Sequence, residues 1–133
     1  MNAQQPSTPQ AKAQPAKARA ATEPGGGGDV ERGRYLVEGV AMCWRCHSPD
    51  GDMGHVDRAH WLLGAPIRSP EPDWAIYAPR LAGRPPGTDD QFITLLTTGI
   101  SRTGKPPRLP MPRFRMSRQD ADAILGYLKS LTR

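Results

Sequence analysis

The sequence predicts an all-α fold of about three to five short helices, joined by long loops and wrapped around a large buried group. Three segments repeat apolar residues at helical spacing, and no segment alternates like a strand for more than a few positions. The 133 residues include 15 prolines and 14 glycines, which favours loops over a large sheet. Only 37% of the residues are hydrophobic, so the long loops need something besides the helices to pack on. A large cofactor would supply that surface.

The composition changes sharply at a run of four glycines, 25–28. The segment before Asp29 contains seven alanines, four prolines and four glutamines, and it has no Leu, Ile, Val, Phe, Trp or Tyr. Such a segment buries too little apolar surface to offset the entropy lost on ordering. We therefore predict a disordered Ala/Pro/Gln/Gly-rich tail or linker over 1–28 and a folded domain over 29–133. The tail lacks the apolar centre of a signal peptide.

The first predicted helix begins after Asp29, whose carboxylate is a favourable N-cap. Val30, Gly33, Val37 and Val40 follow at helical spacing and are expected to share one buried face. A glycine within such a face lowers helix stability, so Gly33 predicts a close crossing with another element.

Two further helices are predicted later in the chain. One follows 88–90, where two aspartates suit the positive end of the helix dipole, and its apolar positions are Phe92, Leu95, Leu96 and Gly99. The other follows Ser117, a good N-cap with Asp120 in the capping-box position, and its stripe comprises Ile124, Tyr127, Leu128 and Leu131. Proline-rich loops over 48–87 and 100–116 separate the three helices.

One short motif carries most of the chemical information. The residues Cys43-Trp44-Arg45-Cys46-His47 have the C-x-x-C-H spacing of covalent haem attachment. Two cysteines three positions apart on a helical turn present both sulfurs to one edge of a porphyrin, where they form thioethers with its vinyl groups. His47 follows directly and would lie beneath the iron as an axial ligand. The motif therefore predicts one covalently held haem c.

Other uses of the two cysteines are less well supported. A thioredoxin-like redox pair needs a βαβ context, which the sequence lacks. A zinc site needs two further ligands, and only His55 and His60 are available, at spacings that support no zinc motif. Two cysteines also exclude a multi-disulfide scaffold and a four-thiolate iron–sulfur or zinc site. A single disulfide would leave the adjacent His47 unexplained.

Five segments in this order resemble the class I, or mono-haem, cytochromes c, and in particular the small bacterial periplasmic type that serves dehydrogenases. They match the N-terminal helix, the attachment motif, the P-x-L-x-G segment, the methionine-ligand loop and the terminal helix of that family, at 32–36, 43–47, 79–83, 110–112 and 126–131. The stretch between Gly64 and Pro79 is longer than in the most compact members. The resemblance implies a cytochrome c fold around one covalent haem c.

The resemblance also implies a methionine sulfur as the second axial ligand, opposite His47. Of five methionines, one lies in the tail and two lie in or near the attachment motif, namely Met1, Met42 and Met53. Met111 lies between Pro110 and Pro112 in a loop that these prolines make stiffer. A stiff loop suits an iron ligand that binds weakly, because it limits the movement of the thioether. Met116 directly precedes a helix cap and is expected to pack against the helix. We therefore expect Met111 to be the ligand, with core filling as its alternative role.

The same resemblance predicts the surroundings of the haem. The carbonyl of Pro79 would accept the other ring N–H of His47 and so orient the imidazole. The pocket is expected to be lined by Leu81, Phe92, Leu95 and Leu96. His55 or His60 as the iron ligand would make a bis-His site, but solvated loop histidines are the favoured interpretation of both.

The whole chain has a net charge of +5, and its basic residues concentrate in the last third. From residue 101 onward the sequence has only two acidic residues, Asp120 and Asp122, and eight basic ones: Arg102, Lys105, Arg108, Arg113, Arg115, Arg118, Lys129 and Arg133. This distribution predicts a redox protein partner with an acidic docking surface, the alternative being a solvated face or arginines paired with haem propionates. No nucleic-acid partner is expected, and no apolar run predicts a transmembrane segment.

Together these features predict an electron carrier rather than an enzyme. It would move single electrons between a periplasmic dehydrogenase and a downstream oxidase or cytochrome. One alternative is a tethered cytochrome subunit of a larger dehydrogenase complex, with 1–28 as its linker. Another is a haem sensor or enzyme in which Met111 dissociates. The family implies a periplasmic location although no export signal is visible, so we expect the signal to have been removed or to lie upstream of Met1.

Overall fold

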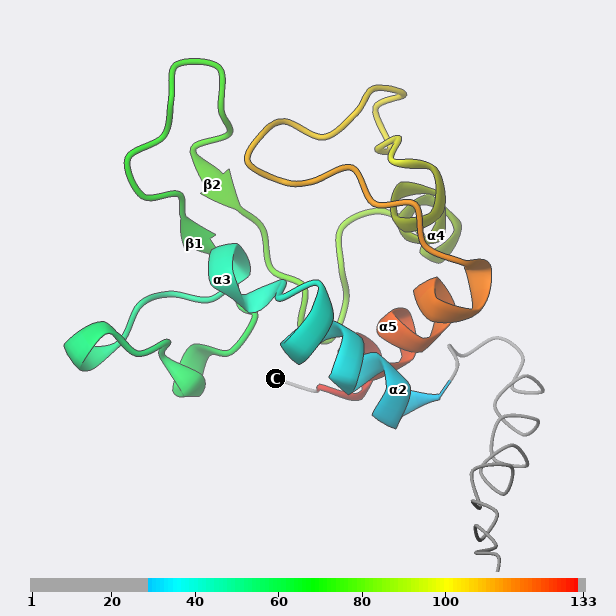
Figure 1. Ribbon diagram of the computed structural model, residues 1–133, viewed down its shortest axis with the longest axis horizontal. Coiled ribbons are helices and arrows are strands. Elements are labelled where there is room, and N and C mark those ends of the chain that lie inside the picture. The colour runs from blue at the N-terminus through cyan, green and yellow to red at the C-terminus, as the bar shows by residue number, and fades with distance from the viewer. Residues whose placement is uncertain (1–28, 132–133) are drawn as a thin grey trace, which may run out of the picture.

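The computed structural model describes residues 29–131 and shows a mainly helical chain with long loops and one short hairpin (Figure 1). In order, the elements are α2 (Val30–Tyr35), the π-helical turn η2 (Leu36–Val40), α3 (Trp44–His47), the 3₁₀ turns η3 (Asp52–Gly54) and η4 (Arg58–His60), β1 (Ala65–Pro66), β2 (Tyr77–Ala78), α4 (Asp89–Thr98) and α5 (Arg118–Ser130). The three predicted helices are confirmed. The predicted tail over 1–28 lies outside the described residues. Between residues 29 and 131, none of the helices has the length and apolar content needed to cross a bilayer.

The first helix starts where it was predicted but is short. Asp29 caps α2 by accepting the backbone N–H groups of Glu31 and Arg32, at 3.0 and 3.3 Å. At Leu36 the helix widens into η2, where the Ala41 N–H donates to the Leu36 carbonyl five residues earlier, at 2.8 Å.

This wider turn corrects the predicted buried face. Val30 and Val40 are exposed rather than buried, Val40 to 54%. A π-helical turn holds more residues than an α-helical turn, so Val40 is rotated away from the face that precedes it. Val30 lies at the open N-terminal end of α2. The face that packs consists of Gly33, Leu36 and Val37.

α2 and α5 cross in direct backbone contact (Figure 1). A Cβ on Gly33 would lie 2.0 Å from the carbonyl oxygen of Ala123 and 2.7 Å from the Cβ of Tyr127, so only glycine fits. An ion pair between Arg32 and Asp120, at 3.1 Å, flanks the crossing. The close crossing predicted from Gly33 is confirmed.

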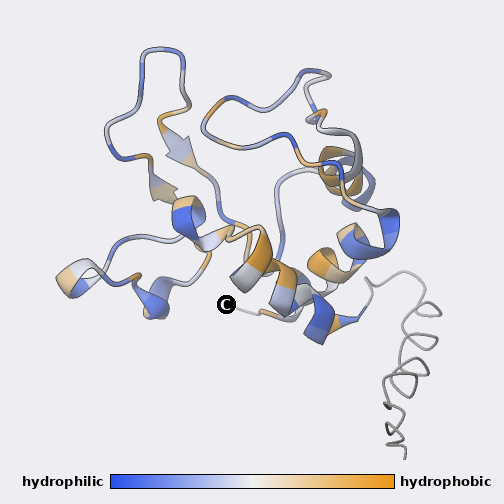
Figure 2. Cartoon of the chain, viewed as in Figure 1, coloured by the Kyte–Doolittle hydropathy of each residue, from blue (hydrophilic) through white to orange (hydrophobic). Residues whose placement is uncertain are grey.

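α5 forms the centre of the core. Residues 123–128 are all buried, because α2 packs against one side of the helix and α4 against another. More of the helix surface is therefore buried than the single apolar stripe that the sequence predicts. Figure 2 shows apolar residues gathered where these helices meet. The predicted cap is present, with the Ser117 hydroxyl accepting the Asp120 N–H at 3.0 Å.

α4 is bounded by strong signals at both ends. The Thr88 hydroxyl accepts the N–H of Gln91, and the Gln91 side chain accepts the N–H of Thr88, which makes a full capping box. Gly99 ends the helix in the left-handed conformation, with φ of 78°. Phe92 and Leu96 are buried on its inner face.

The loop 48–87 completes the core without long strands. β1 and β2 pair antiparallel over two residues each, with Ala65 opposite Ala78. Leu62 is fully buried, and its carbonyl accepts hydrogen bonds from the N–H groups of Leu81 and Ala82, at 2.9 and 3.0 Å. The loop thus brings its own apolar side chains to the helices.

We predict that Gly33→Ala lowers the free energy of unfolding by about 1–3 kcal/mol, because its Cβ must displace the backbone of α5. Urea unfolding of the haem-loaded protein, followed by far-ultraviolet circular dichroism, measures the change. Gly39→Ala is the matched control, since its added Cβ would have no heavy atom closer than 3.9 Å. Equal unfolding midpoints for the two variants would contradict the prediction.

Candidate haem site

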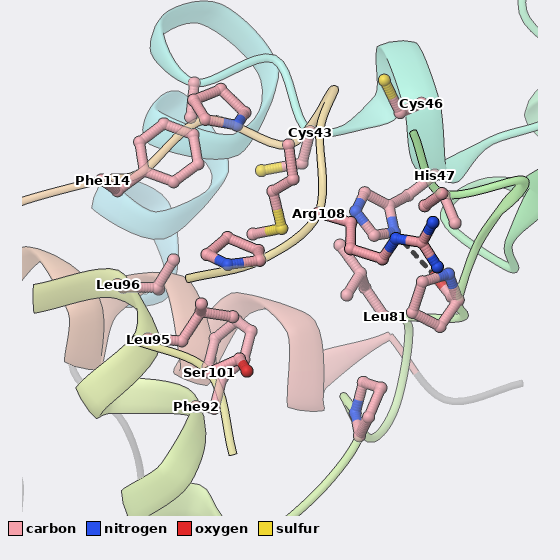
Figure 3. A pocket seen from close by; sticks show the side chains of 18 of the residues that line it. Cys43, Cys46, His47, Leu81, Phe92, Leu95, Leu96, Ser101, Arg108 and Phe114 are labelled. Atoms are coloured by element: carbon pink, nitrogen blue, oxygen red, sulfur yellow. Dashed lines mark hydrogen bonds between the residues drawn. The ribbon is translucent and has the colours of Figure 1, made fainter. Parts of the chain in front are cut away.

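The attachment motif forms one helical turn at the edge of an apolar cavity. Cys43 is the N-cap of α3, and the His47 N–H donates to the Cys43 carbonyl at 3.0 Å, which closes the turn around Cys46. The two thiols are free and half-buried, and both line the cavity together with His47 (Figure 3). Burial raises the pKa of the Cys43 thiol to about 11, so that thiol is protonated at neutral pH.

His47 is buried and is held at both its ring and its backbone. Its Nδ1 lies 2.7 Å from the carbonyl oxygen of Pro79, and its own carbonyl accepts the N–H of Gly64 at 2.8 Å. A carbonyl can only accept, so Nδ1 carries the proton and Nε2 keeps a free lone pair. Burial lowers the pKa of His47, partly offset by the Pro79 carbonyl, and therefore favours the neutral form that binds metals.

The opposite wall of the cavity is apolar. Figure 3 shows the α4 side chains Phe92, Leu95 and Leu96 across the cavity from the motif. Leu81 and Pro79 also line it, so the structure brings together every pocket residue expected from the sequence. Sequence reasoning missed other lining residues, and the larger apolar ones among them are Ile67, Tyr77, Phe114, Ile124 and Leu128. Only the last two had a signal, since they belong to the predicted stripe of α5.

The methionines separate into distinct environments. Met111 and Met42 line the cavity. Met53 is 90% exposed. Met116 packs against the hydrophobic core, and its N–H donates to the carbonyl of Leu96 at 2.9 Å. Of the two methionines on the cavity wall, Met42 immediately precedes the attachment motif, whereas Met111 comes from the distant loop 101–116.

His55 and His60 are exposed on the loop 48–60, and neither lines the cavity. The Nδ1 of His60 lies 2.8 Å from a carboxylate oxygen of Asp57, and this hydrogen bond lowers the pKa of Asp57. The structure therefore gives neither histidine a place at the candidate site.

The donor set suits haem c better than a reactive thiol pair or a bare metal-ion site. Two thiols, a neutral imidazole and a thioether surround one apolar cavity, and haem is itself a large apolar group with these attachment and ligand requirements. Reactive redox thiols have lowered pKa values, whereas that of Cys43 is raised. Within residues 29–131, no three His, Cys, Asp or Glu side chains gather as a metal-ion site would require.

Comparison with known proteins agrees. The cytochrome c family model matches residues 30–132. A diheme cytochrome c-type protein of Cereibacter sphaeroides is 53% identical over 38 residues, 29% of this chain and 13% of that protein. A nicotinate dehydrogenase subunit of Pseudomonas putida is 31% identical over 108 residues, 75% of this chain and 9% of that subunit. The fructose dehydrogenase cytochrome subunit of Gluconobacter japonicus is 31% identical over 113 residues, 77% of this chain and 22% of that subunit.

The chain thus spans less than a quarter of the length of these three relatives. The family match, in contrast, covers nearly all the described residues, including the attachment motif, the cavity and both terminal helices. The chain therefore belongs to the cytochrome c family and is an electron carrier that takes haem c.

Proposed function

We propose that this chain is a single-haem carrier that exchanges electrons with a dehydrogenase in the periplasm. The observation that carries the proposal is one C-x-x-C-H motif on one apolar cavity, with His47 and Met111 both on its wall. In this proposal Cys43 and Cys46 would attach the haem through their sulfurs, and His47 and Met111 would supply ligands to its iron. Residues 29–133 form the cytochrome domain, and 1–28 serve as a tail or linker.

The residues of the site have separate tasks. Haem c, when bound, supplies a one-electron iron couple, and ligation by histidine and methionine favours a high potential. Pro79 orients the ring of His47 through the 2.7 Å hydrogen bond. The apolar walls keep water away, so less solvent has to rearrange when the charge changes. The chain takes one electron from a reduced donor and passes it to an oxidised acceptor, and no bond in a substrate is made or broken.

The surface beside the cavity suits an acidic partner. The basic loop, residues 101–116, has no acidic residue and carries five exposed cations: Arg102, Lys105, Arg108, Arg113 and Arg115. Arg102 and Arg108 line the cavity, which places this charge at its rim. Ile76, Tyr77 and Leu109 are 73%, 53% and 57% exposed. An apolar contact area beside a basic loop supports docking onto an acidic redox protein.

A tethered subunit is the second candidate. It is favoured by the names of two relatives, one a subunit of nicotinate dehydrogenase and the other the cytochrome subunit of fructose dehydrogenase. Copurification of the chain with a dehydrogenase at constant stoichiometry would support this candidate over a freely diffusing carrier.

We predict a c-type absorption spectrum that stays with the polypeptide after denaturation and solvent extraction, with one haem per chain. The oxidised protein should show the far-red band of an iron–thioether bond. Met111→Ala should abolish this band and leave the covalent haem in place. Met116→Leu and Met42→Leu are the controls and should keep the band. A band that survives in Met111→Ala but disappears in one control would move the ligand to that control's methionine.

We also predict that the basic loop speeds oxidation of the reduced protein by hexacyanoferrate(III), a small anionic oxidant. At low ionic strength, Arg102→Gln with Lys105→Gln should slow the second-order reaction about threefold, because the rim attracts the anion less strongly. The difference should vanish at high salt. Arg118→Gln with Lys129→Gln removes the same charge from α5, where the two cations pair with Asp122 and Asp89. Equal slowing by both pairs would contradict local steering.

A further inference from the structure

The segment 64–79, here called the strap, is tied to His47 at both of its ends. At one end, the Gly64 N–H donates to the carbonyl of His47 at 2.8 Å. At the other end, the Pro79 carbonyl accepts from Nδ1 of the same residue at 2.7 Å. The strap contains β1 and β2 and includes the stretch that is longer than in compact cytochromes.

Between these ends the strap is a supported hairpin. Ala65 pairs with Ala78, and the Ile67 N–H donates to the carbonyl of Ile76 at 3.0 Å. Beyond this stem, the guanidinium of Arg68 pairs with the carboxylate of Asp50. These contacts join the two sides of the hairpin and link its outer part to the loop that contains Asp50.

The far part of the strap contacts the basic loop just before Met111. The Ala75 N–H donates to the carbonyl of Leu109 at 2.7 Å. Beside it, Nη2 of Arg108 donates to the carbonyl of Asp73 at 3.4 Å. Within the described residues, the segment 106–113 has no helix or strand, and one internal hydrogen bond, from the Met111 N–H to the Arg108 carbonyl at 3.2 Å, closes a turn in it. The bonds to the strap fix where this turn lies relative to the hairpin.

We propose that the strap positions Met111 relative to His47, with the Ala75 N–H as the main tether. The backbone of residues 75–79 connects the hydrogen bond at His47 to the hydrogen bond at Leu109, two residues before Met111, and pairing with β1 supports this backbone. A tether at this point reduces the conformations open to the ligand loop, so it would hold the Met111 sulfur close to the side of the cavity that faces His47. The inference rests on the proposed role of Met111 as axial ligand.

Exogenous imidazole tests the tether, because it competes with a methionine sulfur for ferric iron. Ala75→Pro removes the N–H donor, and Ala75→Gly retains it. In the full-length haem-loaded protein, Ala75→Pro should bind imidazole about fivefold more tightly, the ratio expected for losing one net backbone hydrogen bond. It should also lose the far-red band at a lower temperature. Ala75→Gly keeps the hydrogen bond, so its imidazole affinity should stay within about twofold of the wild-type value, a smaller change than the one expected for Ala75→Pro.

Two further variants separate the tether from a general loss of stability. Gly33→Ala weakens the crossing of α2 and α5, which does not involve the strap, so it should unfold more easily and yet bind imidazole like the wild type. Arg108→Gln cuts the second hydrogen bond without touching the backbone. It should raise imidazole affinity in the same direction as Ala75→Pro, by a smaller factor.

The outcomes distinguish failure of the proposed role of the strap from failure of the proposed role of Met111 as iron ligand. A wild-type protein with covalent haem but no far-red band would remove Met111 as ligand, and the role of the strap with it. A wild-type band together with unchanged imidazole affinity in Ala75→Pro would overturn the strap alone. If Ala75→Pro takes up no haem, Arg108→Gln decides, and unchanged imidazole affinity in that variant overturns the proposal.

Discussion

The rest of the site depends on one interaction, the hydrogen bond between Nδ1 of His47 and the Pro79 carbonyl. The Pro79 carbonyl selects one tautomer and leaves Nε2 as the only ring nitrogen that can meet a metal. Burial keeps that ring neutral. The backbone carbonyl of the same residue accepts from the Gly64 N–H, so α3 and both ends of the strap meet at one residue. The orientation of the ligand and the shape of the cavity are therefore set by the same few hydrogen bonds.

Features governed by local chemistry were predictable from the sequence. Asp29, Thr88 and Ser117 start helices because their side chains satisfy nearby N–H groups, and the apolar spacing that follows identifies each helix. The C-x-x-C-H motif is equally local. The exposure of Val40 was not predictable, because it follows from a π-helical turn that the apolar spacing does not reveal. Gly33 was informative because a glycine on a helical face costs stability unless a second backbone needs the space.

Long-range features were harder to predict. Ile124 and Leu128 belong to a stripe that the sequence shows, yet the same stripe serves both the helix core and the cavity wall, and spacing alone does not divide these roles. The bond from Ala75 to Leu109 joins two backbones in different loops, so no side-chain pattern marks it. For the segment 64–79, family resemblance indicated only unusual length. Its connection to the ligand loop is visible only in the three-dimensional structure.

The crossing at Gly33 also has a consequence for the order of folding. α2 lies at the start of the described chain and α5 at its end, so the apolar face of α2 has no partner until α5 has been synthesised. Contacts between residues so far apart in sequence slow the folding of a domain, because a long loop must close before they form. The attachment motif lies immediately after α2 and η2, and it is therefore accessible on an open chain before the domain closes. Both thiols are thus more accessible on the open chain than in the folded domain, where they are half-buried.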